Sequence, residues 1–194
     1  MATNNQVNVG LSGNNGGSNG TGTFVGNTTP TLVTPTLGVA SLTSINFGSS
    51  TAGTIGTTTN NNATALSVGE FVSASVLVGA PVAVTNGIVA NITNISLTAG
   101  DWDVSGTCWF VPAGGAATVV ITGVSNTSAA TQSPFGENNF AQSLCPVASG
   151  ATVSLSVNGA RYSLAGTTTI YLIVEGFFAG TMNTYGFISA RRVR

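Results

Sequence analysis

The sequence predicts an all-β protein: an antiparallel, jelly-roll-like sandwich preceded by an extended N-terminal arm rich in Gly, Asn and Thr. From residue 66 onward, apolar residues alternate with hydroxyl-bearing residues at a period of two, which is typical of strands with one buried face. Turn-forming dipeptides separate these segments, and no stretch has the pattern of a strong helix. About eight antiparallel strands spaced in this way are expected to pack as two sheets. We therefore divide the chain into an arm, 1–65, and a head, 66–194.

The arm, 1–65, consists mainly of Gly, Asn, Ser and Thr. Such a segment cannot by itself bury enough apolar surface to offset the entropy of ordering its backbone. Within it, "TPTLVTPTL" (29–37) contains two prolines, which fix φ and favour an extended backbone. This segment is either a polyproline-like linker or an arm that docks onto a partner through Leu32, Val33 and Leu37.

The strands of the head are expected in a regular succession between turns. Trp102 and every second residue after it are predicted to face the core, because side chains alternate between the two faces of a strand. Tight turns are expected at Asn158-Gly159, Ala165-Gly166 and Ala179-Gly180. The expected strands cover 72–78, 88–97, 101–110, 117–124, 152–158, 161–164, 168–178 and 183–190.

One predicted strand, 168–178, is apolar on both of its faces. A strand of this kind needs cover on both sides. A neighbouring subunit is one possible cover for the second face, and the loop 125–150 folding back over it is the other. In the first case, the subunit contact consists of Tyr171, Ile173 and Phe177.

Charge and hydropathy exclude several classes of function. Only 5% of the residues are charged and the net charge is -1, so nucleic-acid binding, which needs many basic side chains, is not expected. No run of about 18 uninterrupted apolar residues predicts insertion into a membrane. The N-terminus lacks the basic start and apolar core of a secretory signal, which favours folding in a cytoplasm. In that reducing compartment, Cys108 and Cys145 are expected to be buried free thiols, with a disulfide as the alternative.

The sequence offers few groups for catalysis. It contains no His and no Lys, which removes the usual nucleophile pairs, imidazole bases, transition-metal clusters and Schiff bases. Asp101 and Asp103 lie two residues apart, on one face of a strand, and they resemble the paired carboxylates of a glycosidase. A turn followed by a strand explains the same stretch more simply. We therefore expect no catalytic residue, no cofactor and no metal site, and keep a small carbohydrate-degrading enzyme as the less favoured alternative.

Three of the four basic residues, Arg191, Arg192 and Arg194, stand in the last four positions. At the end of a strand, guanidinium groups either block edge-to-edge pairing or bind carboxylates. We expect Asp101 and Asp103 to form ion pairs with one or more of these arginines, Arg191 and Arg192 in particular, within or between subunits.

Three stretches resemble one family. The stretch "VNVGLSGNNGGSNGTGTFVGNTTPTLVTPTLG" (7–38) is similar to the N-terminal region of tailed-bacteriophage tail-fibre and related virion-appendage proteins. The stretches "LTAGDWDVSGTCWF" (97–110) and "GTMNTYGFISARRVR" (180–194) resemble their C-terminal trimeric β-sandwich head. The resemblance implies a non-enzymatic homotrimer of the virion, made in the cytoplasm of the host bacterium. Its arm would attach to other virion proteins of the capsid or tail.

The chain has no extended shaft, no heptads and no collagen-like repeat, so a short fibre or a capsid decoration protein (cement or head-fibre) fits its length best. The partner on the host would be a surface glycan or protein. The least patterned loop, 125–150, is the expected exposed surface. Its Phe135, Glu137 and Phe140 are either host contacts or residues that pin the loop to the sandwich.

Overall fold

The computed structural model describes residues 59–131, 139–144 and 146–194. These residues belong to a compact unit, Thr57–Arg194, that begins a few residues before the predicted start of the head. The predicted docking residues Leu32, Val33 and Leu37 lie outside the described residues, as do Phe135, Glu137 and Cys145.

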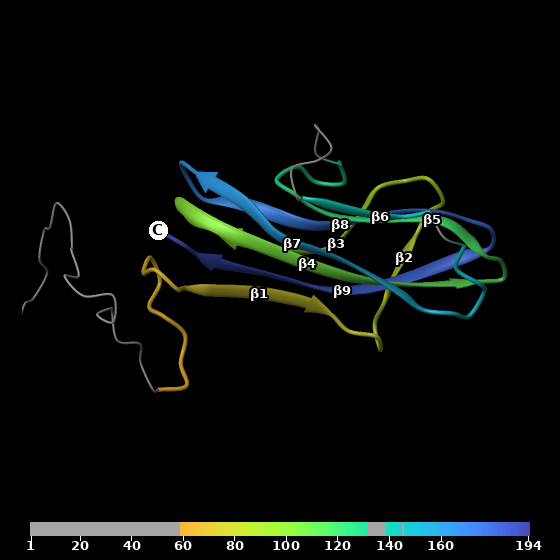
Figure 1. Cartoon of the computed structure of the whole chain (residues 1–194), viewed down its shortest axis with the longest axis horizontal. Helices are drawn as coiled ribbons and strands as arrows, with labels where there is room; N and C mark the ends of the chain where they lie inside the picture. Colours follow the sequence, from red (N-terminus) through yellow and green to blue (C-terminus); the bar gives the residue numbers. More distant parts are fainter. Residues whose placement is uncertain (1–58, 132–138, 145) are drawn as a thin grey trace, which may run out of the picture. The chain divides into compact units, whose positions relative to one another are not determined.

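The described residues form β-strands and no helix (Figure 1), which confirms the all-β class. It follows that none of the described segments is a helix able to cross a membrane. One sheet has the order β1-β9-β4-β7, with β2 also paired to β9, and the second has the order β3-β8-β5-β6. The strands are β1 (Phe71–Val76), β2 (Val82–Val84), β3 (Ala90–Leu97), β4 (Gly100–Ala113), β5 (Ala117–Ser125), β6 (Phe140–Ser143), β7 (Val153–Leu164), β8 (Thr168–Phe178) and β9 (Thr181–Arg192).

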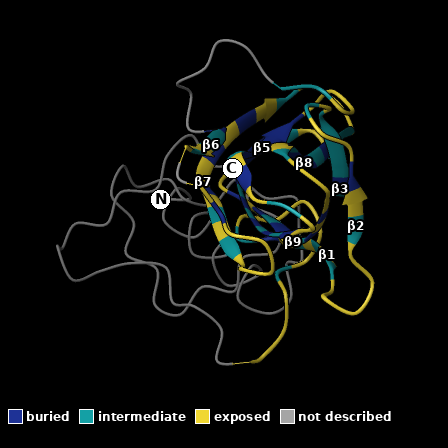
Figure 2. Cartoon of the chain, turned by 90° about the vertical axis from the view of Figure 1, so that its right-hand side faces the viewer, coloured by how far each residue is buried: buried dark blue, intermediate teal, exposed yellow. Residues whose placement is uncertain are grey.

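The order of pairing is that of a jelly roll. With β2 set aside, the first four strands pair with the last four in reverse order: β1 with β9, β3 with β8, β4 with β7, and β5 with β6. All these pairs are antiparallel, and the two four-strand sets face each other as two layers (Figure 2). The predicted jelly-roll-like sandwich is therefore confirmed.

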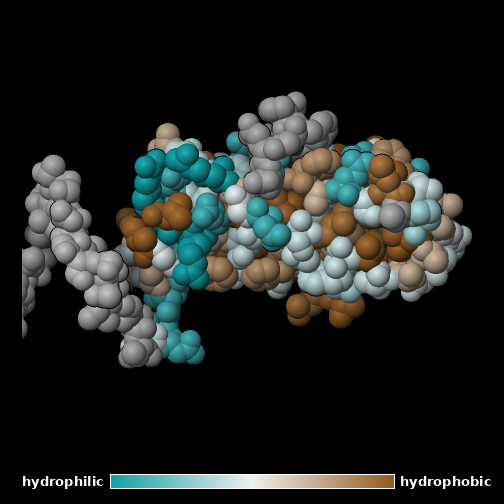
Figure 3. All heavy atoms as spheres, in the orientation of Figure 1, coloured by the Kyte–Doolittle hydropathy of each residue, from teal (hydrophilic) through white to brown (hydrophobic). Residues whose placement is uncertain are grey.

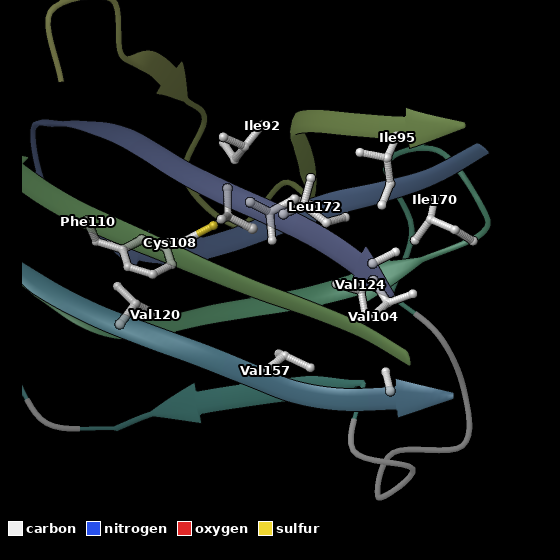
Figure 4. Close-up of a cluster of buried hydrophobic side chains, with 14 of the residues drawn as sticks. Ile92, Ile95, Val104, Cys108, Phe110, Val120, Val124, Val157, Ile170 and Leu172 are labelled. Atoms are coloured by element: carbon white, nitrogen blue, oxygen red, sulfur yellow. The ribbon is translucent and has the colours of Figure 1, made fainter. Parts of the chain in front are cut away.

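The core lies between the two sheets and follows the predicted alternation. On β4, Trp102, Val104, Cys108 and Phe110 are all fully buried, while Asp103 between them is exposed. The second sheet contributes Ile170, Leu172 and Val174 from β8 to the same core (Figure 4). Leu172 lies opposite two glycines, Gly106 and Gly186, where a side chain on the first sheet would not fit without a shift. The large side chain of Leu172 thus fills the space that the two glycines leave at the centre of the sandwich.

Cys108 is a free cysteine whose thiol is fully buried in this core (Figure 4). Burial raises the pKa of the Cys108 thiol to about 12, partly offset by a hydrogen bond with Thr122. Only the thiolate is nucleophilic, so a rise from 9.0 to about 12 lowers the reactive fraction near neutral pH roughly a thousandfold.

We therefore expect Cys108 to resist alkylation in the native protein. In a Cys145→Ser variant, where Cys108 is the only thiol, iodoacetamide should modify the folded chain no faster than the chain unfolds. The urea-unfolded chain should react at the rate of a small thiol compound. Fast modification of the native variant would contradict the buried position of Cys108.

Candidate functional site

A buried ion pair lies at one end of the first sheet. Arg192 of β9 is 4% exposed, and its Nε donates a hydrogen bond to Oε2 of Glu70 at 2.9 Å. Its other nitrogens donate to the carbonyl oxygen of Ala99 at 2.8 Å and to the hydroxyl of Thr98. The guanidinium also lies over the ring of Trp102, 4.3 Å from its centroid, in a cation–π contact. Arg192 thus connects β9, the turn before β4 and the segment before β1.

Glu70 is the acidic partner of this pair, and its position is set by the backbone. Leu66 donates its N–H to Glu70 Oε2 at 2.8 Å, and the backbone of Arg192 donates to the carbonyl oxygen of Glu70. The Leu66 hydrogen bond, together with Arg192, lowers the pKa of the Glu70 carboxyl despite the opposing effect of burial. Glu70 could not be predicted as the partner of Arg192, because it stands 122 positions away and just outside the first predicted strand.

Asp101 forms the second ionic contact at this end. Arg161 of β7 binds it through two hydrogen bonds, Nε to Oδ1 at 2.9 Å and Nη2 to Oδ2 at 2.8 Å. Arg194 binds Oδ2 from the other side, with its Nε at 2.8 Å. The hydrogen bonds from Arg161, together with the charge of Arg194, lower the pKa of the Asp101 carboxyl although burial opposes the shift.

The structure places the four predicted ion-pairing residues in different surroundings. Asp101 pairs with a C-terminal arginine, but that arginine is Arg194, whereas Arg192 pairs with Glu70 instead of an aspartate. Asp103 is exposed and stands directly opposite Arg191 in the pairing register of β4 and β9. The Arg191 guanidinium lies 5.8 Å from the centroid of the Phe71 ring.

Because the pKa values of Glu70 and Asp101 are lowered in the folded chain, the free energy of unfolding depends on pH in the acid range. A carboxyl whose pKa is lower in the folded chain stabilises it above the unfolded pKa, near 4, and this contribution is lost as the pH falls through the folded pKa. We expect the free energy of unfolding to fall steadily below about pH 4 in the wild type and to fall less steeply in Glu70→Gln, which is also less stable at pH 7. Urea denaturation between pH 2 and pH 7 measures both curves. Parallel curves would contradict a role for Glu70.

The Asp101 carboxyl has a lowered pKa, whereas the general acid of a glycosidase needs a raised one. Both oxygens of Asp101 also accept hydrogen bonds from Arg161. Among the described residues, no cluster of three or more His, Cys, Asp or Glu side chains could hold a metal ion. The arrangement at this end therefore suits a structural role better than acid–base chemistry.

The outer face of the second sheet is partly covered by the chain itself. The loop after β5 crosses toward β3, where the side-chain amide of Asn91 donates to Ser128 and its oxygen accepts the N–H of Ala129. Ile173 on β8 is only 2% exposed, so it is not available as the predicted subunit contact. Tyr171 is half-buried and Phe177 is 41% exposed, so both remain at the surface. Of the three predicted contact residues, only Tyr171 and Phe177 can therefore reach a neighbouring subunit.

A groove of about 320 Å³ lies on the same face, over β5, β6 and β8. Ile121 and Glu175 project from neighbouring strands at paired positions, and Phe140 and Gln142 stand on β6. Thr131 of the loop forms a further wall. Phe140, one of the predicted host contacts, is half-buried here and lines this groove. An apolar floor with a carboxylate, an amide and a hydroxyl at its walls is the chemistry of a binding groove.

The outer face of the first sheet carries an aromatic pair. Trp109 and Tyr185 stand opposite each other on β4 and β9, with parallel rings whose centroids are 5.5 Å apart. A smaller groove, of about 160 Å³, runs beside Tyr185 and is lined by Val78, Pro81, Val111 and Asn183. On the side of the molecule in Figure 3, apolar (brown) side chains form separate patches among hydrophilic (teal) and near-neutral (white) ones.

Comparisons of the chain with protein-family models, curated proteins and solved structures found no match.

Proposed function

We propose that the chain is a non-enzymatic structural protein of a tailed-bacteriophage particle, the subunit of a short homotrimeric appendage whose head contacts the host surface. The jelly-roll pairing of β1 to β9 supports this proposal, because viral capsid and lectin domains use the same plan. One fold serves many functions, so the surface of the head is the more specific feature.

The observation that carries the proposal is the number of exposed apolar side chains on a head with very few charges. Phe177 is 41% exposed on the outer face of β8, beside the groove. Single exposed apolar residues are normal, but many of them on a chain with 5% charged residues favour burial against other copies. Within the described part of the chain, the exposed large apolar residues are Leu66, Val68, Phe71, Leu77, Val78, Ile88, Leu144, Phe177, Phe187 and Val193.

Light scattering on the full chain tests the assembly. We expect a particle of three times the 19.2 kDa chain mass at micromolar concentration. Phe177→Ser should weaken assembly at least tenfold, because it removes an apolar anchor from the contact. Phe187→Ser is the matched control, since Phe187 is 40% exposed on the outer face of the other sheet. A monomeric wild type would contradict the proposal. A stronger effect of Phe187→Ser than of Phe177→Ser would indicate that the subunits meet through the first sheet instead.

The place of the protein on the particle is a separate question. Immunogold electron microscopy of particles that carry the chain should label the tail. Label on the shell would assign the chain to capsid decoration instead, and particles without label would contradict a structural role in the virion.

A further inference from the structure

Glu175 is the one described acidic side chain that lies away from every arginine. The chain contains four basic side chains, all of which are arginines, and each of them is placed elsewhere. Arg161 and Arg194 bind Asp101, Arg192 binds Glu70, and Arg191 lies at the Phe71 ring. The groove on the second sheet therefore carries a carboxylate for which the chain itself supplies no cation.

The groove around Glu175 has the chemistry of a guanidinium site. Its polar walls offer hydrogen-bond acceptors, namely the Glu175 carboxylate, the amide oxygen of Gln142 and the hydroxyl of Thr131. The ring of Phe140 adds a π surface, which attracts a cation. Ile121 forms an apolar wall against which the aliphatic stem of a long basic side chain can pack. A volume of about 320 Å³ is sufficient for such a side chain.

Arg194 is an exposed cation that shares its carboxylate with another arginine. Arg161 already satisfies both oxygens of Asp101 in a bidentate pair, so Arg194 is a second guanidinium on a carboxylate that is already bound. The side chain of Arg194 is 74% exposed, whereas that of Arg192 is 4% exposed.

We propose that the groove binds Arg194 of a neighbouring copy, with Glu175 as its counter-ion. This inference rests on the proposed homo-oligomer and names the residue that each copy contributes to the next. Arg194 and Glu175 lie on different surfaces of the head, so the contact is heterologous: each copy presents its Arg194 to one neighbour and its groove to another. A heterologous contact closes into a ring when the rotation between copies permits, as it does in a trimer.

Charge exchange between the two residues tests the contact. The full chain is compared with Glu175→Arg, with Arg194→Glu and with the double variant Glu175→Arg/Arg194→Glu. Sedimentation velocity over a dilution series measures the dissociation constant, and circular dichroism confirms that each variant is folded. Each single variant should weaken assembly at least tenfold, because it places like charges in the groove. The double variant should return the constant to within about threefold of the wild type, because the ion pair is restored with its members exchanged.

A second double variant, Glu175→Arg/Arg191→Glu, is the matched control. It has the same net charge as the first, but Arg191 lies against Phe71, so it should not rescue assembly. Rescue by this control, or folded single variants that assemble like the wild type, would overturn the Arg194 contact and leave the oligomer intact. Failure of the first double variant to recover would also overturn it. A wild type that stays monomeric would overturn the proposed function itself.

Discussion

Replacing Arg192 with methionine is expected to lower the free energy of unfolding by about 3 kcal/mol, because removing one partner leaves the other as an uncompensated charge in a buried pair. The Glu70 carboxylate would keep only its hydrogen bond from Leu66. The carbonyl oxygen of Ala99 and the hydroxyl of Thr98 would lose their donors, and the Trp102 ring would lose its cation. Urea denaturation at pH 7 measures the loss.

Arg191→Met is the matched control for this prediction. Arg191 is the neighbouring residue on β9, but its side chain is exposed and lies at the long distance of 5.8 Å from the centroid of the Phe71 ring. Its replacement should change stability by no more than about 0.5 kcal/mol. Equal losses in the two variants would mean that the general positive charge of this end matters, and not the buried contact of Arg192.

A third variant separates the net contribution of the ion pair to stability from the loss of stability that follows when only one partner is removed. In Glu70→Met/Arg192→Met no charge is left unpaired, so this double variant should be more stable than Arg192→Met alone by at least about 1 kcal/mol. A double variant that is less stable than the single one would show that the two charges stabilise the head independently.

The period-two pattern predicted most of the fold because each strand carries its own signal. Every second residue from Trp102 to Phe110 could be assigned to the buried face of its strand from local alternation alone. The structure confirms this assignment. The same alternation places Arg191 and Arg192 on opposite faces of β9. In the structure, Arg191 is exposed and Arg192 is buried, as this alternation requires.

The partners of these residues could not be predicted in the same way, because they depend on register and on distant segments. Pairing of β4 with β7 places Arg161 directly opposite Asp103, yet the Arg161 guanidinium reaches diagonally to Asp101. Nothing in the local sequence marks Glu70 as the partner of Arg192. Likewise, the side chain of Asn91 forms hydrogen bonds with the loop after β5, at Ser128 and Ala129, 37 and 38 positions further along the chain. Local alternation therefore predicts which face of a strand is buried, whereas the contacts of a side chain depend on how distant segments pair.

Leu172→Ala is the second large effect we expect, with a loss of about 3 kcal/mol, because a fully buried leucine at the centre of the sandwich would leave a cavity. Gly106→Ala should cost about 1–3 kcal/mol for the opposite reason, since its added Cβ would lie 2.6 Å from Cδ1 of Leu172. Combined, the two changes should cost at least about 1 kcal/mol less than the sum of the single losses. The new methyl group then occupies part of the space that Leu172 leaves, and its closest clash is gone.

Gly186→Ala shows whether this rescue is specific. Its added Cβ would also lie near Leu172, at 2.9 Å from Cδ2, but its closest contact, at 2.7 Å, is the backbone oxygen of Thr107. Truncating Leu172 cannot move that oxygen, so Gly186→Ala/Leu172→Ala should recover little of the loss. Double-variant cycles measured by urea denaturation compare the two glycines directly. Equal recovery at both would mean that the sheets shift apart as rigid layers, whereas recovery at Gly106 alone would locate the constraint in the side chain of Leu172.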